Sequence, residues 1–170
     1  MVALERMIAI NIRKSKLSDM EQMLRVYDSA KEKMRLSGNS NQWINGYPSS
    51  ELLLDDIEKG NSYVMEQNGV VCGVFAFIIG EDPTYAVIEN GRWINDEPYG
   101  TIHRIAGDWT VKGVLKESLD FCKMLIPNIR IDTHHDNVIM QHLLDKYGFE
   151  KCGIIYLEDG SPRIAYQKLF

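Results

Sequence analysis

Cysteine, basic charge and long apolar runs are all scarce in this chain of 170 residues. The three cysteines form no CxxC pair, so a structural zinc site has no support. The formal net charge of −5 argues against nucleic acid as the main partner, because phosphate binding needs a basic face. The longest apolar run, Val70–Ile79, is much shorter than a membrane-spanning helix and contains Gly73. We therefore expect neither a membrane nor a nucleic acid as partner.

The odd number of widely spaced cysteines suits free thiols better than disulfides. Two of them, Cys72 and Cys152, fall in apolar strand-like runs and Cys122 falls in a helix-like run, which predicts buried thiols in a reducing compartment. The first ten residues are too short and too interrupted by Glu5 and Arg6 for a signal peptide. These observations predict a cytoplasmic protein.

Length and composition predict one globular domain over residues 1–170. Apolar residues make up 45% of the chain and charged residues 25%, which is ordinary for a globular protein. A chain of this length can bury a substantial core without metal or disulfide support. No repeat, low-complexity tract or linker divides it.

The N-terminal half predicts strands, two helices and a hairpin. The dipeptide Asn68-Gly69 predicts the hairpin, because both residues accept the left-handed conformation that a tight two-residue turn requires. A stripe of methionine and other apolar residues predicts a helix that Gly38 ends, and a shorter helix follows at Glu51–Lys59. The strands are expected at Ile8 to Ile12, Tyr63–Glu66, Val70–Ile79 and Tyr85 to Ile88.

The C-terminal half predicts strands that alternate with helices and a final hairpin. Asp136 or Asn137 can cap the last helix, Gly148 ends it, and Asp159-Gly160 supplies the hairpin turn. The strands are expected at Thr101–Gly107, Ile129–Thr133, Cys152–Leu157 and Arg163–Lys168, and the helices at Val114–Met124 and after Asn137. This order favours a mixed sheet with helices on both faces.

The order of elements and three segments resemble the GNAT superfamily of acetyl-CoA-dependent N-acetyltransferases over nearly the whole chain. Tyr99–Ala106 is similar to the family's central strand, which lies against the thioester. Asp132–Asn137 resembles the strand-to-helix junction on the far side of the cofactor, and Tyr147–Lys168 resembles the closing hairpin of a bacterial subgroup. The resemblance implies an α/β (α+β) fold with a mixed, mainly antiparallel sheet flanked by helices on both faces. It further implies an N-acyltransferase, and a homodimer.

The family's pyrophosphate motif, Arg/Gln-x-x-Gly-x-Gly/Ala, aligns with Thr110–Leu115, where the central Gly113 matches. Thr110 replaces the basic or amide residue, and the bulky Leu115 stands where the backbone approaches the pyrophosphate closely. The loop before the motif is also about two residues short. The resemblance implies acetyl-CoA as acyl donor. The residues expected to hold it are Ile105, Ala106, Gly107, Lys112, Gly113, Val114, Lys116 and Asn137.

Amine acetylation needs a base for the amine, a stabilised oxyanion and a proton for the leaving thiolate. The resemblance assigns the oxyanion to backbone amides near Ile105–Gly107, and it places Leu144 where many members have a tyrosine acid. Candidate catalytic residues are His103 on the central strand, His134 at the end of the next strand and Tyr156 on a late strand. A structural hydrogen bond is the alternative role of both histidines, and a place in the core or in an interface is the alternative for Tyr156.

A metal site at His134-His135-Asp136 is not expected, because adjacent residues of a strand point to opposite faces. Trp43, Tyr47 and Tyr99 are expected to line a pocket for an amine acceptor, either a small molecule or a peptide; packing against the core is their alternative role. The rival function is a catalytically inactive GNAT-fold protein that binds a small molecule or partner in the same cleft. An open backbone at Lys112–Val114 favours the enzyme.

Overall fold

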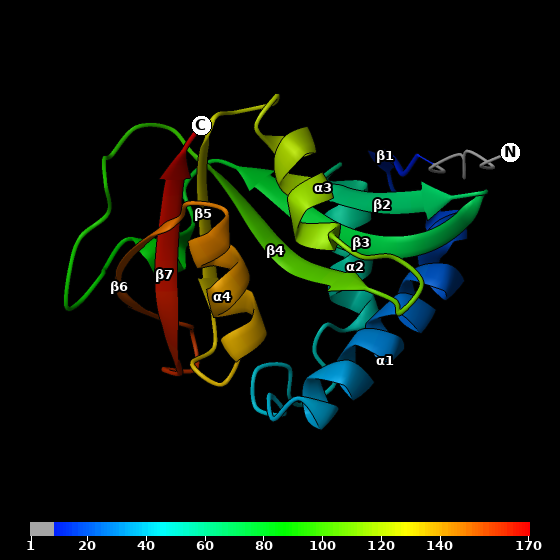
Figure 1. Ribbon diagram of the computed structural model, residues 1–170, viewed down its shortest axis with the longest axis horizontal. Coiled ribbons are helices and arrows are strands. Elements are labelled where there is room, and N and C mark those ends of the chain that lie inside the picture. The colour runs from blue at the N-terminus through cyan, green and yellow to red at the C-terminus, as the bar shows by residue number, and fades with distance from the viewer. Residues whose placement is uncertain (1–8) are drawn as a thin grey trace, which may run out of the picture.

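The computed structural model describes residues 9–170, which form a seven-stranded sheet between two layers of helices (Figure 1). The strand order is β1-β2-β3-β4-β5-β7-β6, and only β4 and β5 run parallel among the neighbouring pairs. The predicted mixed, mainly antiparallel sheet is confirmed. The strands are β1 (Asn11–Lys14), β2 (Ser62–Gln67), β3 (Val70–Ile79), β4 (Gly100–Gly107), β5 (Asn128–Thr133), β6 (Glu150–Tyr156) and β7 (Pro162–Leu169).

The helices begin and end close to the predicted positions. They are α1 (Met20–Leu36), α2 (Ser50–Glu58), α3 (Val114–Cys122) and α4 (Val138–Lys146). Asn137 rather than Asp136 caps α4, because its Oδ1 accepts the Met140 N–H at 3.1 Å. The hairpin between β2 and β3 turns at Asn68 and Gly69, whose φ angles are 53° and 76°.

Two predicted strands need correction. The predicted strand at Tyr85–Ile88 is wrong: Asp82 accepts the Thr84 N–H at 2.9 Å and Pro83 opens a 3-10 turn, η2 (Pro83–Tyr85). Proline at this position suits a turn and withholds a donor from a sheet. The first strand, β1, starts later than predicted, and Ile8 lies outside the described residues.

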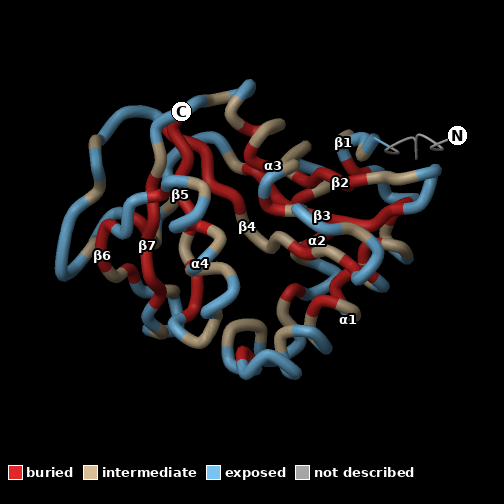
Figure 2. The backbone as a smooth tube through the Cα atoms, in the orientation of Figure 1, coloured by how far each residue is buried: buried red, intermediate tan, exposed pale blue. Residues whose placement is uncertain are grey.

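The strands carry most of the buried positions (Figure 2). Apolar side chains fill both faces of the sheet. Helices α3 and α4 cover one face, where they pack on a cluster that includes Phe75, Ile131 and Tyr166. Helices α1 and α2 cover the other face over β2, β3 and β4. The irregular segment 80–99 covers the remainder of that second face, and Glu89 pairs with Ile154 along β6. The interior therefore divides into three apolar clusters.

Strands β4 and β5 part soon after they begin. Their pairing consists of Gly100 with Ile129 and Thr101 with Arg130. From there to its C-terminal end β4 has no partner in β5, and the two strands diverge beneath α3 and α4 (Figure 1). This divergence opens the sheet at its centre.

A β-bulge in β4 lies beside the opening. Val74 of β3 pairs with Ala106 and Ala76 pairs with His103, so one residue of β3 faces two residues of β4. Arg104 is one of the two residues of β4 in the bulge, and its φ angle is 51°. The bulge interrupts the alternation of side chains, so two consecutive ones lie on the same face. His103 contacts Asp82 there, and Arg104 contacts Asp56 of α2.

All three cysteines are free and buried, as predicted. The exposed fractions of Cys72, Cys122 and Cys152 are 2%, 0% and 7%. None of the helices within residues 9–170 has the length and apolarity that crossing a bilayer takes.

Candidate active site

A cleft of about 1470 Å³ lies where β4 and β5 part. Its walls come from β4, the ends of β5 and β7, the loop between α1 and α2, the start of α3, and one side of α4. The volume exceeds the ~300–1,000 Å³ of an ordinary small-molecule pocket. The cleft therefore has room for an extended ligand and a second molecule beside it.

The N-terminus of α3 opens into this cleft. Gly113 precedes the helix with a φ of 77°, and no side chain caps the first turn. A Cβ atom placed on Gly113 would meet nothing within 4 Å, so the space beside this backbone is open. The first N–H groups of a helix lack partners within the helix and attract anions. Lys112 also lines the cleft at this point.

Leu115 does not fill the space beside Gly113. Its side chain is 4% exposed and packs in the core cluster beneath α3. Thr110 donates its N–H and hydroxyl to the Asp108 carboxylate, which Arg25 contacts at 3.1 Å. These two departures from the family motif therefore stabilise the loop and the helix. Leu115 also lines the cleft at the start of α3.

The end of β4 approaches the start of α3 closely. A Cβ atom on Gly107 would lie 2.6 Å from Cγ2 of Val114, so only glycine fits there without a shift. Ile105, Ala106, Gly107 and Val114 all line the cleft, together with Lys112 and Gly113. With Asn137, seven of the eight residues expected to hold the acyl donor line the cleft.

Lys116 and Asn137 have surroundings different from those of the other six. Lys116 is exposed, pairs with Asp120 at 2.6 Å and lies outside the cleft lining. Asn137 does line the cleft, but its side chain caps α4 and also donates to Oε1 of Gln42 at 2.9 Å. Its part in binding would therefore compete with two structural hydrogen bonds.

His103 forms a pair with Asp82 at the cleft wall. The His103 Nε2 lies 3.0 Å from Asp82 Oδ2, and both residues line the cleft. Burial alone would raise the pKa of Asp82, but hydrogen bonds from His103 and Thr84 outweigh it and lower this pKa to about 2. Asp82 is thus a fixed anion beside the imidazole. The sequence offered no signal for it, since it lies in an irregular segment 21 residues before His103.

Arg104 links the bulge to α2 and to the loop between α1 and α2. Its guanidinium donates two hydrogen bonds of 2.8 Å to Asp56 and one of 3.2 Å to the Tyr47 hydroxyl. The Tyr27 hydroxyl donates to the Arg104 carbonyl at 2.7 Å, and Trp43 packs edge-on against Tyr27. Trp43 and Tyr47 line the cleft, as the sequence analysis expects of them.

Two predicted site residues lie elsewhere. Tyr99 is buried outside the cleft lining, where its hydroxyl accepts the Asp82 N–H at 2.8 Å. Tyr156 is 40% exposed on the edge strand β6, and its hydroxyl donates to Glu89 at 2.9 Å. The structure therefore places Tyr99 in a supporting position and Tyr156 away from the cleft.

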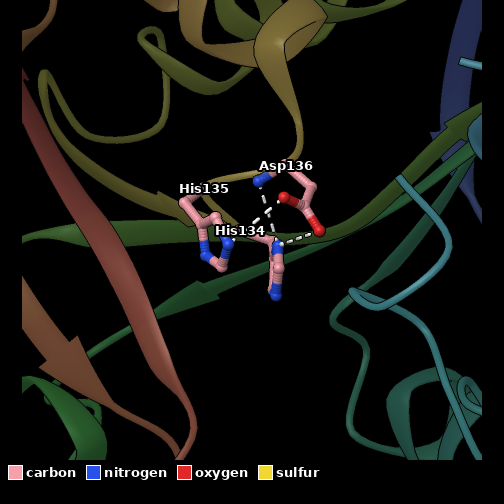
Figure 3. A group of neighbouring side chains, drawn as sticks. All are labelled: His134, His135 and Asp136. Atoms are coloured by element: carbon pink, nitrogen blue, oxygen red, sulfur yellow. Dashed lines mark hydrogen bonds and ion pairs between the residues drawn. The ribbon is translucent and has the colours of Figure 1, made fainter. Parts of the chain in front are cut away.

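His134, His135 and Asp136 form a compact turn at the end of β5 (Figure 3). The prediction that the two rings point to opposite faces is wrong: β5 ends at Thr133, so strand alternation no longer applies, and the rings stack with centroids 4.2 Å apart. The three residues each offer a ligand atom within 4.8 Å of the others. However, Nδ1 of His134 already accepts the Asp136 N–H at 3.0 Å, so the lone pair of this nitrogen is not free for a metal ion.

His134 itself lines the cleft and is largely buried. Burial lowers its pKa, and the nearby Arg163 and His135 lower it further. The imidazole is therefore favoured in its neutral form, which can accept a proton. Sequence reasoning missed five cations of the cleft wall, and no local pattern marks them: Lys33, Lys59, Arg104, Lys146 and Arg163.

No protein-family model and no curated protein sequence matches the chain. Among solved structures, a GNAT-family acetyltransferase from Streptococcus agalactiae is 33% identical, with 95% of each chain covered and a TM-score of 0.82. A GNAT-family acetyltransferase from Listeria monocytogenes is 20% identical, with 95% of each chain covered and a TM-score of 0.70. PaiA N-acetyltransferase from Thermoplasma acidophilum, solved with coenzyme A, is 17% identical at a TM-score of 0.65, covering 95% of this chain and 99% of that one.

Proposed function

This chain belongs to the GNAT family of acetyltransferases, and we propose that it transfers an acetyl group from acetyl-CoA to the amine of a small molecule or peptide. One observation carries the proposal: the uncapped start of α3 opens into the cleft between β4 and β5. That arrangement offers an anion site next to a channel between two strands. A ligand that carries a linear arm on a pyrophosphate would match both parts, with the pyrophosphate at the anion site and the arm in the channel.

The residues of the cleft fit coenzyme A in charge and in shape. Gly113 and Val114 offer backbone at the helix start, and Lys112 and Lys33 supply positive charge for phosphate groups. The β5-facing side of β4 is free of strand pairing beyond Thr101, so its amides can serve a ligand. When bound, acetyl-CoA supplies the activated acetyl group. The solved PaiA structure from Thermoplasma, which contains coenzyme A, supports this assignment by its shared fold.

His103 is the proposed base. It adjoins the bulge of β4, and Asp82 fixes its ring, so Nε2 and Nδ1 keep defined positions. The neutral imidazole takes a proton from the acceptor amine, and the carboxylate of Asp82 stabilises the imidazolium that results. Backbone amides of β4 next to Ile105 donate to the carbonyl oxygen of the acetyl group, a role that does not depend on side-chain identity.

A second function has one observation in its favour. Leu144 stands where many family members place a tyrosine acid, and it is fully buried in the core. A protein without that acid would bind acetyl-CoA or another ligand in the cleft without turnover. The open backbone at Gly113 argues for the enzyme over this alternative.

The deciding experiment titrates acetyl-CoA into the purified protein in a calorimeter and then assays acetyl transfer to a panel of amines. Lys112→Glu reverses a charge in the cleft, and we expect about tenfold weaker binding from the loss of one charge-assisted contact. Lys116→Glu makes the same change on the exposed side of α3, paired with Asp120, and serves as the matched control.

Three outcomes separate the alternatives. Binding that Lys112→Glu weakens and Lys116→Glu leaves nearly unchanged, together with acetyl transfer, supports the enzyme. The same binding without transfer to any amine supports the binding protein. A wild-type protein that does not bind acetyl-CoA at millimolar concentration contradicts the proposal.

A further inference from the structure

Three polar side chains form a strip across the sheet on the face opposite α3 and α4. Ile102, Ile131 and Ile164 belong to the cluster under those helices, so their neighbours in each strand face the other way. The neighbours that line the cleft are His103 on β4, Asp132 on β5 and Arg163 on β7. This strip forms the floor of the cleft on that face of the sheet. It lies between the apolar cluster under α1 and α2 and the apolar cluster under segment 80–99.

Arg163 is a buried cation without a counter-ion. Its residue is 6% exposed, and its guanidinium donates to the backbone carbonyls of Pro162 at 2.8 Å and Gln42 at 3.3 Å. Within residues 9–170 no carboxylate forms an ion pair with it. By contrast, the buried Arg104 has two hydrogen bonds with Asp56.

The acidic groups near Arg163 are held at a distance. Asp132 pairs with Ala165 across the strands, so Arg163 is its diagonal neighbour, about 7–8 Å away between backbones. The Asp132 carboxylate already accepts the Tyr85 hydroxyl at 2.6 Å. Burial lowers the pKa of Arg163, and the charges of Asp132 and Asp159 oppose this only in part.

A guanidinium in this situation is suited to one kind of ligand. Its planar fork matches a carboxylate with two parallel hydrogen bonds, and a buried charge is costly until a partner satisfies it. Gln42 helps to hold the Arg163 guanidinium in place. Its carbonyl accepts a hydrogen bond from Arg163, and its side chain accepts one from Asn137. The site is therefore preorganised across two segments that are distant in sequence.

We infer that Arg163 binds a carboxylate of the acetyl acceptor, so that the acceptor is a zwitterion of the amino-acid type; this rests on the proposed function. Asp132 lines the cleft on β5, between the strand of His103 and that of Arg163, and its negative charge favours a protonated amine in that part of the cleft. Arg163 on β7 and His103 on β4 lie on opposite sides of β5, and β4 and β5 have already parted at the level of His103. The amine and the carboxylate need not share one carbon atom.

The test compares each acceptor with its own uncharged derivative. The twenty proteinogenic amino acids, together with β-alanine and γ-aminobutyrate, are assayed beside their carboxamides, with CoA release as the readout. We expect the carboxylate form to have about 10- to 100-fold higher kcat/KM, mainly through KM, because a hydrogen-bonded charge pair is lost in the amide. Thermal shift in the presence of CoA measures binding of the same compounds without turnover.

Two variants locate the effect. Arg163→Gln should abolish the preference for the carboxylate form, and Arg163→Lys should restore part of it. Arg130→Gln is the matched control: Arg130 is also buried, on the neighbouring strand, but it stacks 3.9 Å from the ring centre of Tyr99 and lies outside the cleft lining. Should Arg163→Gln fail to fold, Arg163→Lys and the wild-type preference still decide the matter.

The inference is overturned if the wild type treats carboxylates and carboxamides alike, or if Arg163→Gln keeps the preference. It is also overturned if acetyl-CoA binds but no carboxylate-bearing amine is acetylated or shifts the melting temperature. Calorimetry with acetyl-CoA in the same samples separates these results from a failure of the proposed function, in which acetyl-CoA itself would not bind.

Discussion

Asp82 and His103 meet through a 3.0 Å contact between Oδ2 and Nε2, although they lie on different elements: Asp82 caps the η2 turn and His103 lies in β4. The carboxylate fixes the ring orientation and stabilises the charged imidazole. It also ties segment 80–99 to the central strand. This contact thus connects the stability of the segment with the proposed proton transfer.

Asp82→Asn should reduce catalysis. General-base catalysis contributes about 10²- to 10⁴-fold, and His103→Ala should lose that factor. Asp82→Asn should lose part of it, because the carboxylate that holds the ring at 3.0 Å is removed. Steady-state CoA release measures both losses, and they should appear in kcat rather than in KM for acetyl-CoA. An unchanged kcat in Asp82→Asn would show that Asp82 has no positioning role.

Asp82 should also make folding acid-sensitive. Its pKa is lowered from 3.8 to about 2 in the folded protein, so its stabilisation is complete above the unfolded value and disappears as the pH falls towards 2. The shift corresponds to about 2 kcal/mol. Urea unfolding of wild type and Asp82→Asn should differ by this amount at about pH 5 and converge near pH 2. A constant difference across that range would contradict the assignment.

Gly107→Ala should disturb the junction of β4 and α3. The added methyl group would lie 2.6 Å from Val114 Cγ2, and overpacking of this kind costs about 1–3 kcal/mol. Acetyl-CoA affinity should fall as well, since α3 must shift. The double variant with Val114→Ala makes room and should recover both properties. If the single variant unfolds at the wild-type urea concentration, the contact is not restrictive.

Arg104→Met should destabilise the fold by about 3 kcal/mol, because it leaves the Asp56 carboxylate buried without a partner. The double variant Arg104→Met/Asp56→Leu removes both charges and should regain much of the loss. Denaturant unfolding of the wild type, the two single variants and the double variant gives the coupling energy. Equal losses in the single Arg104 variant and the double variant would argue against a compensated ion pair.

Local signals predicted the elements whose ends depend on one or two residues. Asn68-Gly69 was sufficient for the β2–β3 hairpin, and Gly148 for the end of α4, because both depend on a left-handed backbone. The alternating pattern gave the strands on either side of the cleft. Fold class and family also followed from the order of these elements.

Features that depend on tertiary contacts escaped sequence reasoning. Arg104 takes up a left-handed conformation that its residue type disfavours, and only its bonds to Asp56 and Tyr27 explain it. Arg163 looked like an ordinary strand residue, since nothing nearby in sequence shows that it lacks a counter-ion. The stacking of His134 on His135 followed from where β5 ends, which the pattern fixes only to within about two residues.

The burial of all three cysteines has a practical consequence for enzymology. Acetyl transfer would release one new thiol per turnover, and thiol-specific colour reagents would count it. Burial raises the pKa of each of the three cysteine thiols, so the reactive thiolate is rare as well as inaccessible. Native protein should therefore contribute almost no background in such an assay, and a burst of colour from the protein alone would report unfolding.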